Sequence, residues 1–184
     1  MLPFRLTICG ISELPNLTPE GVSHVVSVLD PGTPTPDPLD EWALVARHDF
    51  RFHDDWDARE DRRPPNPEDV VRVLETGAAL AGDDVSHLLV HCWAGMSRST
   101  AIAMTLMAQS APGREAEIPE ALLAVRQPAW PNSRIIQMAD DQLGAQGRLI
   151  AAKEEVFRQV VRDHPHVIET MQNFGRGHEI PDTG

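Results

Sequence analysis

The chain has 184 residues, a length that suits one domain with a sizeable hydrophobic core. Its formal net charge of −12, from 16 basic and 28 acidic residues, argues against nucleic acid and anionic membrane surfaces as partners. We expect neither a membrane-spanning helix nor a signal peptide, because no apolar run of about 18 residues is present and the N-terminus lacks a basic region followed by an apolar stretch.

The chain contains two cysteines, Cys9 and Cys92. Two are too few for a disulfide framework, which predicts a reducing, cytoplasmic location and a working thiol. Cys9 lies in an apparent strand, where packing in the core is its expected role. The alternative is a resolving role under oxidation, if parallel strands bring it near Cys92.

Four short apolar runs are predicted to form β-strands. They span residues 6–11, 24–29, a part of 42–52, and 87–91. The second run is rich in valine and therefore predicts a buried strand. Between the second and third runs, the proline-rich residues 31–38 predict a turn-rich loop that no helix crosses.

A helix is predicted between the third and fourth strands. Asn66 is its cap, Pro67 occupies its first turn, and Glu68 and Asp69 complement the helix dipole. Further helices are expected from about residue 98 and over residues 119–126, 133–143 and 149–162. Strands and helices alternate in the first part of the chain, and helices cluster in the later part. This order predicts an α/β fold, with a central, mostly parallel sheet flanked by helices on both faces.

We expect a single domain over residues 1–163, and the sequence shows no internal repeat. The remaining residues, 164–184, carry proline, glycine and charges of both signs. This composition predicts a loosely packed C-terminal extension.

The most informative segment joins the fourth strand to the next helix. It reads His91-Cys92-Trp93-Ala94-Gly95-Met96-Ser97-Arg98-Ser99. A strand, a tight loop and a helix N-terminus form an anion cradle, because the loop amides point inward and the helix dipole adds roughly half a positive charge. A cysteine at the start of such a loop is stabilised as the thiolate, and the fork of Arg98 suits two oxygens of a phosphoryl group. The segment therefore predicts a nucleophile inside a phosphate site; the alternative is a buried structural cysteine.

This segment resembles the phosphate loop of the cysteine-dependent protein tyrosine phosphatases, which reads His-Cys-x5-Arg-Ser/Thr. Its fixed positions are all present, as His91, Cys92, Gly95, Arg98 and Ser99. The resemblance extends over about residues 5–145. It is closest to the small dual-specificity-like branch, and within it to tyrosine phosphatases of the bacterial type. It implies a phosphotyrosine protein phosphatase-like fold and a hydrolase that cleaves phosphomonoesters through a phosphocysteine intermediate.

The resemblance also implies a role for each loop residue. Cys92 is the nucleophile, and the phosphate is bound by Arg98 and the loop residues Trp93, Ala94, Gly95, Met96 and Ser97. Ser99 hydrogen-bonds the cysteine sulfur, although a hydroxyl in a first helical turn also satisfies local backbone. His91 is a buried residue that orders the loop, and Asn132 belongs to a segment packed beneath it, where it is also a candidate helix cap.

A phosphate ester leaving group needs a proton, so a carboxylic acid should face the loop. Three aspartates after the third strand compete for this role: Asp54, Asp55 and Asp57. Alternation along the strand puts Asp54 on the same face as Phe52. The aromatic-x-Asp pattern of the resembled family also favours Asp54. We therefore expect Asp54 to be the general acid, with Asp55 second and Asp57 third.

No metal site is expected, because the remaining histidines are scattered without paired ligand spacing. No organic cofactor is expected either, since Arg98 and backbone dipoles supply the positive charge. The expected substrate is a phosphorylated protein or a small phosphomonoester; its identity and the oligomeric state stay open. Two other functions also stay open. One is a phosphoresidue-binding module without turnover, and the other is different thiol chemistry on a Cys-x5-Arg loop, such as arsenate reduction or sulfur transfer.

Overall fold

The computed structural model describes residues 2–42, 45–55 and 60–181. Its sheet is built from β1 (Arg5–Gly10), β2 (His24–Leu29), β3 (Ala46–Arg51) and β4 (His87–Cys92). The strand order is β1-β4-β2-β3, and every neighbouring pair is parallel. The predicted α/β fold with a parallel central sheet is confirmed, and the four predicted strands are found within one or two residues of their expected ends.

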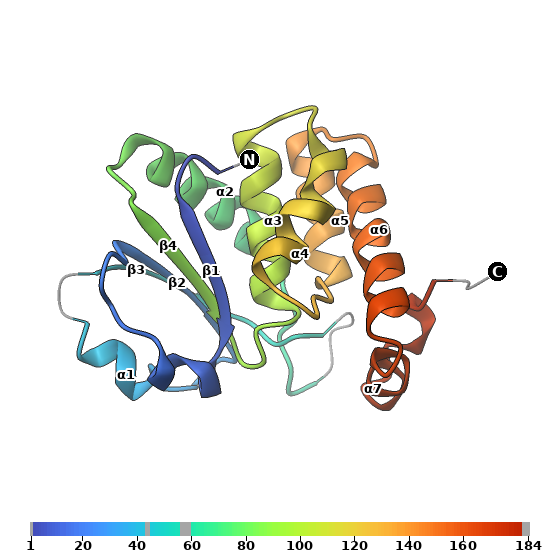
Figure 1. Ribbon diagram of the computed structural model, residues 1–184, viewed down its shortest axis with the longest axis horizontal. Helices are drawn as coiled ribbons and strands as arrows, with labels where there is room; N and C mark the ends of the chain where they lie inside the picture. The colour runs from blue at the N-terminus through green and yellow to red at the C-terminus, as the bar shows by residue number, and fades with distance from the viewer. Residues whose placement is uncertain (1, 43–44, 56–59, 182–184) are drawn as a thin grey trace.

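The larger helical layer covers one face of the sheet (Figure 1). It consists of α2 (Pro67–Gly82), α3 (Arg98–Ser110), α4 (Ile118–Val125), α5 (Ser133–Leu143) and α6 (Arg148–Asp163). Helix α3 lies at its centre, where it contacts three strands as well as α2, α4 and α5. It is buried from Arg98 to Ala108, as expected of a helix that is largely apolar around its circumference. Among the helices of the described residues, none has the length and hydropathy needed to cross a membrane.

The opposite face of the sheet carries a thinner layer, formed by the 3-10 helix η1 (Ile11–Asn16) and the one-turn helix α1 (Asp37–Asp40). Together with the sheet they enclose a second, smaller core. Its buried members are Cys9, Leu14, Val22, Val25, Leu39, Trp42 and Leu89. No helix crosses residues 31–38, as predicted, although α1 begins within this range, at Asp37. Pro38 fits there, since the first turn of a helix needs no backbone N–H donor.

The C-terminal segment, residues 164–181, forms α7 (Val167–Asn173) and the 3-10 helix η3 (Gly177–Glu179). Val167 and Met171, one helical turn apart, are buried in the main core. Glu179 accepts a hydrogen bond from the indole of Trp130 at 2.9 Å. The expectation of loose packing was therefore wrong for these residues, because the average composition concealed a short amphipathic helix. A domain boundary at residue 163 stays a prediction.

Candidate active site

The candidate site lies at the carboxyl edge of the sheet. Because all strands run parallel, the residues that follow them meet at one edge, which is where open α/β sheets bind ligands. Cys92 ends β4, Asp30 directly follows β2, and Asp54 lies three residues beyond β3. The N-terminus of α3 begins at the same edge with Arg98.

Four carbonyl groups of the loop from Trp93 to Ser97 accept hydrogen bonds from the surrounding chain. The bonds run from Ile11 N to Trp93 O (3.0 Å), from Arg126 Nη2 to Ala94 O (3.0 Å), from Trp130 N to Met96 O (2.8 Å) and from Asn132 N to Ser97 O (3.3 Å). In a trans peptide the N–H points opposite to the preceding C=O, so outward carbonyls turn the amides toward the centre of the loop. Such converging amides form an anion-binding concavity.

Glycine is required at two points where the loop packs on the end of β1. Gly95 has φ of +70°, and a Cβ there would lie 2.5 Å from the backbone of Cys9 and Gly10. A Cβ on Gly10 would in turn lie 2.9 Å from the carbonyl carbon of Ala94. Any side chain at Gly95 would therefore displace the loop and disturb the arrangement of its backbone amides.

The sulfur of Cys92 lies 3.1 Å from the hydroxyl oxygen of Ser99, which is within hydrogen-bonding reach. Both residues are buried, and the hydroxyl belongs to the first turn of α3. The pairing predicted between these two side chains is therefore present. A hydroxyl that donates to the sulfur stabilises a thiolate.

Arg98 is anchored by one end of its guanidinium group. Its Nη1 donates to a carboxylate oxygen of Asp30 and to the backbone oxygen of Phe52, each at 2.6 Å. The side chain is only 4% exposed, and its Nε is buried with no hydrogen-bond partner in the part of the chain that the structure describes. A buried guanidinium N–H without an acceptor is costly unless an anion occupies the site. The Nε side of Arg98 is therefore available for two oxygens of a bound anion.

Asp54 reaches the phosphate loop. Its Oδ1 accepts hydrogen bonds from the hydroxyl of Ser97 and from the amide of Asn132, both at 2.7 Å. Asp55 instead pairs with Arg62 within its own loop. Asp57 lies outside the described residues. Of the two described candidates for the general acid, only Asp54 contacts the loop that begins at Cys92.

His91, which precedes Cys92 in β4, and Cys9, which is paired with His91 from β1, are not candidates for proton transfer or redox exchange. His91 lies with its Nε2 2.6 Å from the hydroxyl of Ser27, and burial lowers the pKa of His91 to about 4. A neutral His91 orients its surroundings without adding charge. Burial raises the pKa of the Cys9 thiol to about 12, and Cys9 belongs to the smaller core on the opposite face from Cys92. Core packing therefore accounts for Cys9 better than a resolving role does.

The side chain of Asn132 bonds both the first turn of α5 and Asp54. Its side-chain oxygen accepts from the backbone N–H of Ile135 at 3.0 Å, which caps α5 as predicted, while its amide nitrogen holds Asp54. Within the loop, the side chains of Trp93 and Ala94 are exposed and that of Met96 is half-buried. We infer that these three residues would meet a ligand mainly through their backbone.

Sequence reasoning missed three charged residues that support the site: Asp30, Glu13 and Arg176. Asp30 carried a detectable signal, because it directly follows a buried parallel strand. Glu13 accepts from the backbone N–H of Gly10 at 2.6 Å and from Arg126, the residue that holds the carbonyl of Ala94. Arg176 donates to the hydroxyl of Ser97 at 2.8 Å from the segment that we expected to be loosely packed. No local pattern predicts the contact of Arg176 with Ser97 or that of Glu13 with Arg126, since these partners are distant in the chain.

Comparison with known proteins supports the fold assignment. No protein-family model and no curated protein sequence matches the chain. Among solved structures, Tk-PTP in its active form is 19% identical with a TM-score of 0.56, and the match covers 78% of this chain and 99% of that one. Human DUSP28 is also 19% identical with a TM-score of 0.56, over 77% and 92% of the two chains. The human tyrosine phosphatase-like serine/threonine/tyrosine-interacting protein is 17% identical with a TM-score of 0.56, over 79% and 94%.

The chain has the fold of the tyrosine and dual-specificity phosphatases, as the resemblance of its loop implied. Identities this low show the fold alone. Assignment to a bacterial-type branch stays a prediction.

Proposed function

We propose that the protein is a phosphomonoesterase, a protein tyrosine or dual-specificity phosphatase that acts through a phosphocysteine intermediate on Cys92. The observation that carries the proposal is the buried Nε of Arg98, which has no hydrogen-bond partner among the described residues; Arg98 closes the loop that begins at Cys92. A cationic fork, converging amides and a thiol within one short loop suit a tetrahedral dianion, and they provide a nucleophile for its phosphorus.

In the first step the thiolate of Cys92 attacks phosphorus in line with the ester oxygen. An S–P bond forms while the P–O bond to the leaving group breaks. The Nε side of Arg98 and the loop amides hold the three equatorial oxygens, where negative charge is concentrated. Asp54 gives its proton to the departing phenol or alcohol oxygen.

In the second step Asp54, now a carboxylate, takes a proton from a water molecule. The water oxygen attacks phosphorus and the S–P bond breaks, which releases inorganic phosphate and restores the thiolate. Ser99 would stabilise the departing sulfur through its hydroxyl. Each cycle therefore returns both Cys92 and Asp54 to their starting states.

The proposed substrate is a phosphorylated protein or a small phosphomonoester, because all of these offer the same terminal group to the cradle. Since the chemistry needs a free thiol and both cysteines are free, we also propose a reducing, cytoplasmic location. The net charge of −12 disfavours nucleic acid as a substrate. Phosphate release from an aryl phosphate would separate this function from simple phosphoresidue binding and from other thiol chemistry.

Replacement of Asp54 by asparagine is expected to lower kcat/KM by about a hundredfold or more for aryl phosphates with weakly acidic phenols. The loss should shrink for strongly acidic phenols, whose oxygen leaves without a proton. The alkaline limb of the rate–pH profile should flatten, because that limb reports deprotonation of the acid. Asp55→Asn is the matched control, since Asp55 pairs with Arg62. A profile that flattens in Asp55→Asn but not in Asp54→Asn would transfer the role to Asp55.

Turnover is expected to be independent of divalent metal ions, because Arg98 and the loop amides supply the positive charge that a metal would otherwise provide. Phosphate release after dialysis against a strong chelator, compared with release after dialysis against buffer, measures this directly. Equal rates are expected. A rate that falls on chelation and recovers with a divalent ion would contradict the proposed charge supply.

A further inference from the structure

A continuous hydrogen-bonded chain joins the C-terminal segment to Asp54. The Nη1 of Arg176 donates to the hydroxyl oxygen of Ser97 at 2.8 Å. That hydroxyl donates to Oδ1 of Asp54 at 2.7 Å, and the amide of Asn132 donates to the same oxygen at 2.7 Å. Arg176, which lies 79 residues beyond Ser97 in the chain, is thus two hydrogen bonds from the proposed general acid.

The direction of these bonds follows from the chemistry of the groups. A guanidinium can only donate, so Ser97 must accept from Arg176 and turn its own proton toward Asp54. Asn132 also donates to Oδ1 through its amide. Because Oδ1 already accepts two hydrogen bonds, the acid proton of Asp54 is more stable on Oδ2. The carboxyl group is therefore held with a defined oxygen for proton transfer.

Each of the three nitrogens of Arg176 already donates to an acceptor, which takes three of its five N–H groups. Nε donates to Glu179 at 2.7 Å, Nη1 to Ser97, and Nη2 to the backbone oxygen of Pro131 at 3.3 Å. Its side chain is 18% exposed. We therefore expect Arg176 to act on the reaction through Ser97 and through the packing of the 131–132 backbone.

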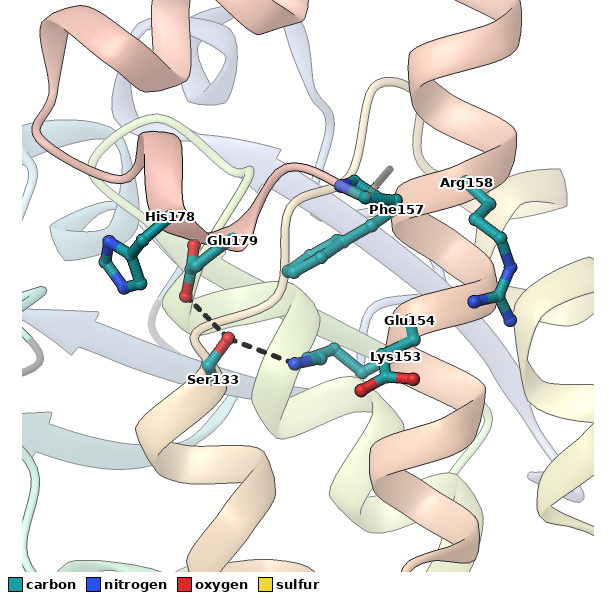
Figure 2. A pocket seen from close by; sticks show the side chains of 8 residues that line it. Ser133, Lys153, Glu154, Phe157, Arg158, His178 and Glu179 are labelled. Carbon is teal, nitrogen blue, oxygen red and sulfur yellow. Dashed lines mark hydrogen bonds between the residues drawn. The ribbon is translucent and has the colours of Figure 1, made fainter. Parts of the chain in front are cut away.

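Glu179 fixes Arg176 from the other side. Its carboxylate also accepts from the hydroxyl of Ser133 at 2.5 Å and from the indole of Trp130 at 2.9 Å. Burial opposes its ionisation, but Arg176 and these donors together hold the pKa of Glu179 below its ordinary value. Figure 2 shows Glu179 facing Ser133 at the edge of a cavity of about 540 Å³ beside α6, with Lys153 bonded to the same hydroxyl. Arg176 is thus held by an ion pair with Glu179, whose carboxylate is itself fixed by Ser133 and Trp130.

We propose that Arg176 is a positioning residue for the general acid: anchored by Glu179, it fixes the Ser97 hydroxyl as a donor and so keeps the acid proton of Asp54 on the oxygen that faces the reaction. This inference rests on the proposed function, in which Asp54 protonates the leaving group. Among the described residues, two other cations near Asp54 have carboxylate partners of their own: Arg98 pairs with Asp30, and Arg62 pairs with Asp55. Arg176 is then the cation whose removal alters the orientation of Asp54.

The test is Arg176→Met in the full chain, with Arg162→Met as the matched control. Arg162 is exposed on α6 and pairs only with its neighbour Asp163 among the described residues. For aryl phosphates with weakly acidic phenols, Arg176→Met is expected to lower kcat/KM about tenfold, which is part of the contribution of a general acid. For strongly acidic phenols the rate should stay near that of the wild type. Inhibition by inorganic phosphate should be unchanged, because the cradle is intact.

A double-mutant cycle separates this inference from the proposed function. In an Asp54→Asn background, Arg176→Met should cause no further loss, because the group that it positions is already inactive. An equal loss for all leaving groups, or a loss that persists in the Asp54→Asn background, would overturn the positioning role while the phosphatase mechanism stands. Absence of any leaving-group effect in Asp54→Asn itself would instead overturn the assignment of the acid.

Arg176→Lys is the second variant in case Arg176→Met does not fold. A lysine keeps the charge and most of the packing, but its single ammonium cannot bond Glu179 and Ser97 in the same planar geometry. It should show the same dependence on the leaving group with a smaller loss. If Arg176→Lys matches the wild type for every phenol, the simultaneous bonds of Arg176 to Glu179 and Ser97 have no role in catalysis and the inference is wrong.

Discussion

Replacement of Cys92 by serine should abolish turnover, with a loss of at least about four orders of magnitude in kcat. A serine hydroxyl stays protonated at neutral pH and is a far weaker nucleophile than a thiolate, so no covalent intermediate forms. Binding of inorganic phosphate should persist, since Arg98 and the loop amides are unchanged. Phosphate release from an aryl phosphate and calorimetric titration with inorganic phosphate measure the two effects separately.

Cys9→Ala is the matched control for this variant. Cys9 is the other cysteine of the chain and is buried in the smaller core on the opposite face of the sheet. Its replacement should cost some stability and leave turnover per folded molecule unchanged. Retained turnover in Cys92→Ser, or equal losses in both variants, would show that the chemistry does not depend on the thiol of Cys92.

Arg98→Lys should lower kcat/KM by about a hundredfold or more. The two sides of the Arg98 guanidinium have different partners. Nη1 donates to Asp30 and to the Phe52 carbonyl, while Nε has no partner among the described residues and is proposed to bind the phosphoryl oxygens. A lysine ammonium is a single point charge and cannot serve both sides at once. Pairing with Asp30 would draw it away from the phosphate.

Steady-state kinetics of Arg98→Lys, beside a titration with inorganic phosphate, measure this loss. Arg148→Lys is the control, because Arg148 lies on α6 and pairs with Glu115, away from the loop. We expect weaker phosphate binding as well as slower turnover in Arg98→Lys, and neither effect in Arg148→Lys. A near-normal rate in Arg98→Lys would mean that Arg98 does not clamp the phosphoryl group.

Features encoded by neighbouring residues were predictable from the sequence. The cap of α2 is one example: Asn66 accepts from the backbone N–H of Asp69, and the Asp69 carboxylate accepts in return from the backbone N–H of Asn66. Such caps involve residues three apart, so the pattern is visible in a short window. The loop after β4 is equally local, because Cys92, Gly95 and Arg98 lie within seven consecutive residues, 92–98.

Features that depend on distant partners were not predictable in this way. The ion pair of Arg98 with Asp30 joins residues 68 apart, and the bond of Arg176 to Ser97 joins residues 79 apart. Neither pairing follows from periodicity or local propensity. For Arg176 the error had a further cause, because the mixed composition of residues 164–184 suggested loose packing. Strand alternation did favour Asp54, which contacts the loop, although its role in proton transfer stays a prediction.

The most direct test of the mechanism is to trap the covalent intermediate. The Asp54→Asn variant, expected to be slow in hydrolysing the phosphocysteine, would be mixed with an activated aryl phosphate and quenched within the first turnover. Peptide mass spectrometry would then locate any added phosphoryl group. The proposed mechanism predicts one phosphoryl group on Cys92, formed together with a burst of phenol. A burst of phenol with no phosphoryl group on Cys92, or with the group on another residue, would contradict it.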